Sequence, residues 1–114
     1  MSAYRSGFDI FDELSRLVPE VRRIVVPKLV KQELAKIARG GGRAGSAARL
    51  ALRLCSRCEE ADVEAEGADE AIVRLAEQNP SCVVCTNDAE LKNILKSRGI
   101  QVIGVRDYSH LDFL

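Results

Sequence analysis

Several residue types and motifs that mark common enzyme classes are scarce or absent. The chain has no tryptophan and a single histidine, His110, and aromatic residues make up only 4% of it. A lone histidine near the C-terminus, with no nucleophile pattern beside it, argues against a hydrolase with a catalytic triad. No glycine-rich phosphate loop of the Rossmann or P-loop type is present, because GGGRAGS follows a helical pattern and not a strand.

Long apolar runs and targeting signals are missing as well. No run approaches the roughly 20 apolar residues that a membrane-spanning helix needs. The N-terminal segment MSAYRSGFDIFDEL lacks the charged-then-apolar pattern of a signal peptide, so we expect a cytoplasmic protein. The 114 residues are 46% hydrophobic, which suits one globular domain covering residues 1–114.

The four cysteines form two CxxC pairs, Cys55 with Cys58 and Cys82 with Cys85. This spacing is compatible with a four-cysteine zinc site, and Cys55 with Cys58 could form a disulfide. However, Cys82 and Cys85 flank an apolar run typical of a strand, where residues three apart point to opposite faces. The glycine turn of a zinc knuckle is also missing. We therefore expect small, buried core residues at these positions.

Charge is segregated along the chain, although the formal net charge is zero. Residues 22–57 carry ten Lys or Arg and one acid, whereas residues 58–90 carry ten Asp or Glu and one base. The basic segment is a candidate surface for a polyanion. Alternatively, the two oppositely charged segments attract each other within the fold.

Hydrophobic periodicity predicts alternating helices and strands. Five helices are expected at residues 9–18, 28–39, 47–58, 68–79 and 87–99, and four strands at residues 24–26, 62–67, 81–86 and 101–107. SCVVCT is expected to be the most buried strand. Strands that alternate with helices pair in parallel through right-handed crossovers. The predicted fold is therefore a three-layer α/β/α domain with a mainly parallel sheet.

Turn and cap residues separate these elements. GGGRAGS, at residues 40–46, is predicted to be a mobile loop ending at Ser46, the N-cap of the next helix. Asn87 is the predicted N-cap of the last helix, with Glu90 in the capping-box position, and Gly99 is predicted to follow its C-cap. SHLDFL, the last six residues, is expected to be a short tail.

Three acidic residues follow the predicted strands. Asp88 comes two residues after SCVVCT, Asp69 comes shortly after DVEAEG, and Glu33 lies in the second turn of the helix after RRIVVP. In an open parallel sheet the carboxyl ends of the strands share one edge, so we expect the three carboxylates there. Clustered carboxylates favour Mg²⁺ or Mn²⁺, which can activate water for attack on a phosphodiester. Taken singly, each acid has a simpler explanation, as a helix-capping or solvated residue.

The segments VPKLVKQEL, GADEAIVRLA, VVCTNDAEL and GIQVIGVRD together resemble a PIN domain. The resemblance is strongest to small archaeal PIN proteins related to nucleases that process ribosomal RNA, and it extends from Phe8 to nearly the end of the chain. It implies a metal-dependent endoribonuclease that uses Mg²⁺ or Mn²⁺ to cleave RNA and leaves a 5′-phosphate and a 3′-hydroxyl.

Carried over position by position, the resemblance implies a set of metal-binding acids, namely Glu33, Asp69 and Asp88, with Asp107 as a further candidate. Thr86 and Asn87 would support the site. The candidates for contacts to RNA phosphates are the basic residues Lys28, Lys31, Arg43, Arg49 and Arg53. Because no row of aromatic side chains is available for base stacking, we expect little sequence specificity.

The pattern departs from the family at its beginning. PIN domains start with an apolar strand ending in an aspartate, whereas here a helix is predicted from Asp9 and Ser2–Tyr4 are too few to form that strand. We therefore expect the first family strand and its acid to be absent. The strand at residues 24–26 would then pair with residues 83–86 or with a second chain, and an exposed sheet edge of this kind favours a homodimer.

The sequence leaves four functions open. The first is the metal-dependent ribonuclease, and the second is a catalytically impaired PIN-like module that binds RNA or protein without cleaving it. The third is the toxin of a toxin–antitoxin pair, which shares the fold. The fourth is an adaptor stabilised by zinc. Salt-sensitive RNA binding without turnover would distinguish the second from the first.

Overall fold

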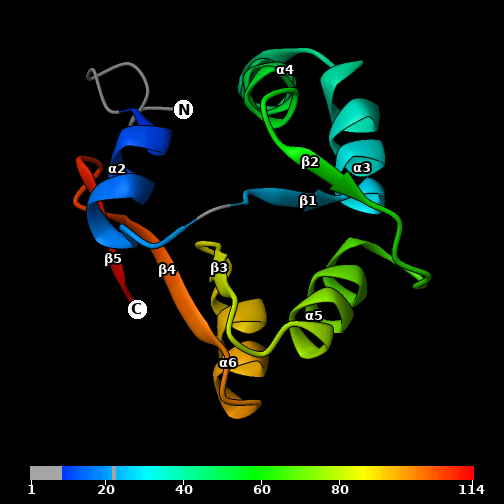
Figure 1. Cartoon of the computed structure of the whole chain (residues 1–114). Coiled ribbons are helices and arrows are strands. Elements are labelled where there is room, and N and C mark those ends of the chain that lie inside the picture. The colour runs from blue at the N-terminus through cyan, green and yellow to red at the C-terminus, as the bar shows by residue number, and fades with distance from the viewer. Residues whose placement is uncertain (1–8, 22) are drawn as a thin grey trace. The chain divides into compact units, whose positions relative to one another are not determined.

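The computed structural model describes residues 9–21 and 23–114 (Figure 1). The described part contains five helices and five strands in the order α2 (Ile10–Leu17), β1 (Val25–Pro27), α3 (Lys28–Ala38), α4 (Gly42–Cys55), β2 (Glu59–Ala61), α5 (Ala68–Gln78), β3 (Val83–Cys85), α6 (Ala89–Ser97), β4 (Gln101–Arg106) and β5 (His110–Phe113). The expectation for Ser2–Tyr4 falls outside the described residues. Among the described helices, none has the length and apolar character to span a membrane.

The chain divides into two compact units. The hairpin unit comprises residues 1–22 and 76–114, and the helix-pair unit comprises residues 23–75. Helix α5 begins in the helix-pair unit and ends in the hairpin unit.

The hairpin unit contains a three-stranded sheet in the order β3-β4-β5. Strands β3 and β4 run parallel, with Val83 opposite Gln101, and β5 returns antiparallel to β4. The predicted tail is therefore wrong, because its polar–apolar alternation forms β5 and buries Leu111 completely. The prediction for SCVVCT is also wrong. The most buried strand is β4, since residues 102–104 are buried, whereas the residues of β3 are half-buried or exposed.

Helix α2 packs its apolar face on this sheet. Its N-cap is Asp9, whose side chain accepts hydrogen bonds from the backbone N–H groups of Phe11 and Asp12. The predicted helix over residues 9–18 is thus confirmed to within a residue at each end. The core beneath it consists of buried Val18, Ile103 and Leu111, surrounded by Ile10, Leu14, Leu17, Val21, Val83 and Val105.

Helix α6 connects β3 to β4 and is capped at both ends. Its N-cap is Asp88, one residue later than the predicted Asn87, and the Asp88 carboxylate accepts the backbone N–H of Leu91 at 2.8 Å. Gly99 follows the C-cap as predicted, with φ +76. Its N–H donates to the Lys96 carbonyl, and the N–H of the next residue donates to the Leu95 carbonyl, both at 3.0 Å, which is the Schellman arrangement.

The helix-pair unit contains a sheet of two short parallel strands, β1 and β2. Strand β2 precedes the strand predicted at residues 62–67. Its position is set by pairing with β1, next to which the backbone N–H of Glu59 donates to the Ile24 carbonyl at 2.9 Å. Residues of low strand propensity therefore form β2. Within its own unit β1 pairs with β2. The expected pairing of residues 24–26 with residues 83–86 would join the two units and stays a prediction.

Two ion pairs reinforce the contact between β1 and β2. Arg23 pairs with Glu59 at 2.9 Å, and Lys31 pairs with Glu60 at 3.2 Å. Both connect the basic segment, residues 22–57, with the acidic segment, residues 58–90. Some of the segregated charges therefore attract each other within this unit.

Helices α3 and α4 pack closely against each other in the same unit (Figure 1). The predicted loop over residues 40–46 is wrong, because α4 already begins at Gly42 and its N-cap is Gly41, not Ser46. A Cβ atom added at Gly45 would lie only 2.1 Å from the Gly40 carbonyl oxygen. Gly45 is therefore a helical residue that lets the backbone before α4 approach closely, and not a loop residue.

Candidate active site

Asp88 lies just beyond the carboxyl end of β3, at the start of α6, as the sequence predicts. Asp88 is exposed, and one of its carboxylate oxygens, Oδ1, caps α6 by accepting the Leu91 N–H. Its own backbone N–H donates to the Thr86 hydroxyl at 3.2 Å. Within the described ranges, no hydrogen bond or ion pair engages Oδ2, so this oxygen is free to bind a ligand.

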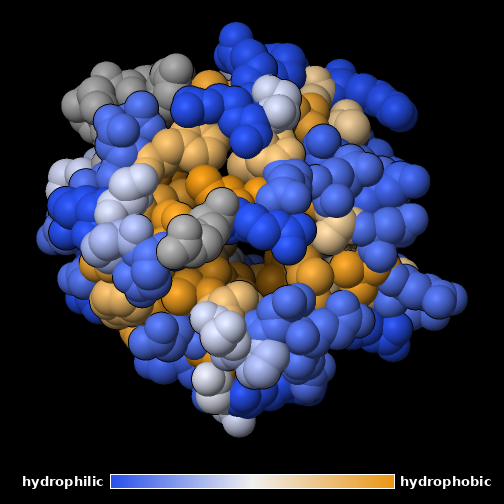
Figure 2. Space-filling model, viewed as in Figure 1, coloured by the Kyte–Doolittle hydropathy of each residue, from blue (hydrophilic) through white to orange (hydrophobic). Residues whose placement is uncertain are grey.

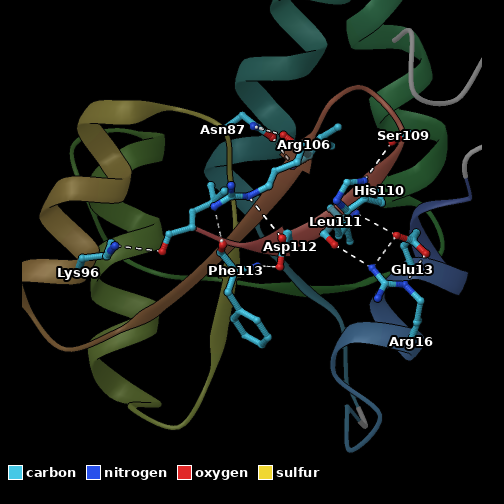
Figure 3. Close-up of polar contacts among 12 residues, drawn as sticks. Glu13, Arg16, Asn87, Lys96, Arg106, Ser109, His110, Leu111, Asp112 and Phe113 are labelled. Carbon is cyan, nitrogen blue, oxygen red and sulfur yellow. Dashed lines mark hydrogen bonds and ion pairs between the residues drawn. The ribbon is translucent and has the colours of Figure 1, made fainter.

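The two residues before Asp88 attach it to β4, and Figure 3 shows the side chain of one of them, Asn87. The Asn87 side chain donates to the Val105 carbonyl at 3.0 Å and accepts the Val105 N–H at 2.9 Å, while the Thr86 N–H donates to the Ile103 carbonyl at 2.9 Å. Asn87 thus continues the β3–β4 pairing with its side chain. Three hydrogen bonds therefore hold the segment before Asp88 against β4, and a fourth, from the Asp88 N–H to the Thr86 hydroxyl, fixes Asp88 to that segment.

Gly104 of β4 leaves room for Thr86 and Asn87 to lie this close to the strand. It was not among the residues singled out from the sequence. A Cβ atom at this position would lie 2.8 Å from the Thr86 carbonyl oxygen and 3.1 Å from Asn87 Oδ1. A glycine inside an otherwise apolar strand is a known signal of close approach by a neighbouring backbone. That signal was available in QVIGVRD.

Glu33 and Asp69 belong to the helix-pair unit. Glu33 lies in the second turn of α3 and Asp69 in the first turn of α5, and both are exposed. Next to Asp69, Glu70 accepts the Glu66 backbone N–H at 2.9 Å and pairs with Arg74 at 2.7 Å. Glu70 thus ties the residues before α5 to the helix, and no hydrogen bond or ion pair among the described residues engages the Asp69 carboxylate.

The predicted acid set is thus divided between the units, with Glu33 and Asp69 in one and Asp88 in the other. Within either unit, the described residues contain no group of three or more His, Cys, Asp or Glu that could hold a metal ion. Asp107 does not follow the last strand, because β5 comes after it. It lies in the hairpin turn between β4 and β5, with φ 52.

The predicted RNA-contacting residues differ in what they already bind. Arg49 donates to the Ala38 carbonyl at 2.8 Å, to the Gly40 carbonyl at 3.1 Å and to Ser46 Oγ at 3.2 Å, so it ties α4 to the end of α3. Lys31 is paired with Glu60. Lys28, Arg43 and Arg53 are exposed, and Figure 2 shows hydrophilic residues over the α3 and α4 surface.

A hollow of about 440 Å³ lies along one face of α4. It is lined by Ser46, Arg49, Leu52 and Arg53. Because Arg49 is fixed by carbonyl groups, the hollow carries one oriented guanidinium and one guanidinium, that of Arg53, on an exposed residue. Most of the exposed lining of the hollow is apolar, and the two guanidinium groups are the parts of it that could contact a phosphate group.

The four cysteines are free thiols. Cys55, Cys58 and Cys82 are half-buried and Cys85 is exposed, so the expectation of buried core residues is wrong. Burial raises the pKa of the Cys55 and Cys58 thiols above their ordinary value, which lowers their thiolate fraction at neutral pH.

Comparison with known proteins identifies the fold family. A family model described as PIN like domain matches residues 1–108. The chain is 32% identical over 112 residues to Ribonuclease VapC4 of Methanocaldococcus jannaschii, covering 96% of this chain and 84% of that protein. It is 40% identical over 103 residues to Ribonuclease VapC9 of Archaeoglobus fulgidus, covering 90% of this chain and 73% of that protein.

A solved structure agrees with these sequence relationships. The PIN domain endonuclease Utp24 superimposes with a TM-score of 0.77 and 25% sequence identity, over 99% of this chain and 84% of that one. The fold is therefore the PIN-like α/β fold predicted from the sequence. Two ribonucleases, the family match and this endonuclease structure together show that the chain belongs to the PIN-like domain family.

Proposed function

We propose that this chain is a PIN-type endoribonuclease that hydrolyses RNA phosphodiesters with the help of Mg²⁺ or Mn²⁺. The observation that carries the proposal is the attachment of Asp88 at the carboxyl end of a parallel strand pair, with one carboxylate oxygen free, in a relative of two ribonucleases. This is the edge at which open α/β sheets bind their ligands. The family match over residues 1–108 also supports a single functional domain.

The donor atoms suit the divalent metal that the family implies. Glu33, Asp69 and Asp88 are exposed carboxylates, and hard oxygen ligands are those that Mg²⁺ and Mn²⁺ prefer. When bound, such an ion would lower the pKa of a water molecule and offset negative charge at phosphorus. Thr86 and Asn87 would act through Asp88, by fixing the backbone that carries its carboxylate.

Phosphate contacts along the RNA are assigned to the basic surface of α3 and α4. Arg53 and the fixed Arg49 line the hollow on α4, and the exposed Lys28 and Arg43 would extend the contact. Lys31 would contribute less, because its ammonium group already pairs with Glu60. Binding should therefore weaken as salt increases, by the release of counterions from the RNA.

RNA cleavage in Mn²⁺ by the wild-type chain and by Asp88→Asn tests the proposal. Asparagine is as good an N-cap as aspartate, so this change keeps the cap of α6 and removes the charge. The matched control is Asp9→Asn, which alters the N-cap of α2 in the same way. We expect cleavage to fall at least about 100-fold in Asp88→Asn, to cease in EDTA and to persist in Asp9→Asn.

Equal activity of Asp88→Asn and Asp9→Asn would refute the assignment of Asp88. Salt-sensitive RNA binding with no turnover by the wild-type chain would instead favour the catalytically impaired binding module. Self-association through a sheet edge stays a prediction, and it rests on β1 and β3 having one strand partner each among residues 9–21 and 23–114. Size-exclusion chromatography with light scattering tests it, and a monomer at high concentration would reject it.

A further inference from the structure

The turn between β4 and β5 contains an unusual residue choice. The Ser109 N–H donates to the Arg106 carbonyl at 3.1 Å, and the two residues between them, Asp107 and Tyr108, have φ values of 52 and 56. Positive φ at both central positions suits the twist of a β-hairpin, but glycine is the favoured residue at the second of them. Aspartate tolerates this conformation, whereas a bulky side chain such as tyrosine does so at a cost in free energy.

Packing does not compensate for that cost. Tyr108 is 74% exposed, more than any other exposed large hydrophobic residue in the described part of the chain. A ring that the fold neither buries nor needs for its turn is available for a ligand. Side chains on both sides of the turn are engaged: the Arg106 guanidinium donates to the Phe113 carbonyl at 3.0 Å, and the Ser109 hydroxyl hydrogen-bonds to the His110 ring at 3.0 Å (Figure 3).

The position of the turn relates Tyr108 to the candidate site. Strands β3 and β4 are parallel neighbours, so the residues after β3 and those after β4 lie at the same edge of the sheet. Asp88 follows β3, and Tyr108 follows β4. The hydrogen bonds between Asn87 and Val105 fix the first segment beside the end of β4, just before the turn.

We propose that Tyr108 is a stacking platform for an unpaired base of the RNA, at the sheet edge that carries Asp88. This inference rests on the proposed function and deepens it, because it assigns base contact to a chain whose few aromatic residues predict none. Single-stranded RNA is commonly held by bases that stack on aromatic rings, and such stacking accepts every base. The chain would therefore prefer RNA with an unpaired nucleotide near the cleaved bond, with little preference for its identity.

Fluorescence provides a direct test, because the chain has no tryptophan and only two tyrosines. In a Tyr4→Phe background the emission comes from Tyr108 alone. The test is to titrate this protein with a short unlabelled oligouridylate and with an abasic oligonucleotide of the same length. Both titrations contain EDTA, so that no cleavage occurs. Stacking predicts quenching by the oligouridylate and none by the abasic chain, which presents the same phosphates without bases.

Three substitutions separate stacking from a structural role. Tyr108→Ala should weaken oligouridylate binding about 5-fold to 100-fold and leave binding of the abasic chain unchanged. Tyr108→Phe should bind within about 2-fold of wild type, since stacking uses the ring and not the hydroxyl group. Tyr108→Gly should bind as weakly as the alanine variant while its unfolding temperature does not fall, because glycine relieves the turn.

Phe113→Ala is the matched control, since Phe113 is the other exposed aromatic residue of the described hairpin and pairs with Ile103, away from the turn. Unquenched emission on RNA binding, with unchanged affinity in Tyr108→Ala, would overturn the inference and leave the proposed function standing if cleavage still requires Asp88. A wild-type chain that neither binds nor cleaves RNA would overturn both the inference and the proposed function.

Discussion

The hairpin unit and the helix-pair unit reach stability by different means. The largest fully buried side chains, Leu95, Ile103 and Leu111, all lie in the hairpin unit. In the helix-pair unit the buried hydrophobic residues are Ala48, Val63, Ala71 and Val73, and α3 has no buried residue. Burial of large apolar side chains thus stabilises the hairpin unit, whereas the helix-pair unit depends on small buried residues and close backbone approach, to which its exposed ion pairs add little.

The two units also protect their backbones differently. On β5, the Leu111 N–H is bound by Glu13 and the Leu111 carbonyl by Arg16, both at 2.9 Å (Figure 3). The Phe113 N–H and carbonyl are bound by Asp112 and Arg106. Side chains therefore occupy the outer edge of β5 in the way a further strand would, which lowers its tendency to pair with another chain.

The largest effect should follow from removing a large buried side chain. Leu111→Ala is expected to lower the free energy of unfolding by about 3 kcal/mol, through lost burial and a cavity in the hairpin core. Ile37→Ala, at a residue of α3 that is 42% exposed, should cost well under half of that. Denaturant unfolding measures both, and hydrogen exchange should accelerate in residues 76–114 for the first variant. Equal costs would break the comparison between the units.

A smaller effect is expected where the backbone approaches most closely in the helix-pair unit. Gly45→Ala should destabilise the protein by about 1–3 kcal/mol, because its Cβ would collide with the Gly40 backbone, even though alanine favours a helix. Gly41→Ala is the control, since nothing lies within 4 Å of a Cβ there. Hydrogen exchange should accelerate in residues 23–75. A Gly45→Ala protein as stable as the control would show that the helix pair adjusts its spacing freely.

The contrast between the units also explains which elements could be predicted from the sequence. Periodic apolar residues located α2, and the glycine after α6 was recognised as its terminator, because these patterns are local. Strand β2 was misplaced because two glutamates form it, and only pairing with β1 and the opposite charges of Arg23 and Lys31 make that strand favourable. Those partners are distant in sequence, and no local pattern reports them.

The candidate site shows the same limit. The position of Asp88 after a strand could be predicted, but its role as N-cap in place of Asn87 could not. Asn87 is withdrawn from capping by its two hydrogen bonds to Val105, a residue of another strand. Similarly, β5 was missed because its residues form a strand only after the turn at Asp107 brings them against β4.

The smallest expected effect is a pH-dependent one, and it compares one carboxylate from each unit. Hydrogen bonds from Arg16 and from the Leu111 N–H lower the pKa of Glu13 from 4.5 to about 2. Arg23 likewise lowers the pKa of Glu59, but the Glu59 side chain is 53% exposed, whereas that of Glu13 is 19% exposed. A depressed pKa means that the folded state favours the charged form, so the stabilisation is present above the unfolded pKa and disappears as the pH falls through the folded one.

Glu13→Gln should therefore lower stability at pH 7 by about 1–2 kcal/mol and remove part of the loss that the wild-type protein suffers between pH 4.5 and about pH 2. Glu59→Gln should change stability only slightly, and more so at low salt, because water screens an exposed ion pair. Thermal unfolding from pH 7 to pH 2 measures both. The Glu13 contact takes the place of a neighbouring strand at the edge of β5, whereas the Glu59 contact only adds to the pairing of β1 with β2. A larger effect at Glu59 would therefore mean that ion pairs stabilise the helix-pair unit more than the contacts at the β5 edge stabilise the hairpin unit.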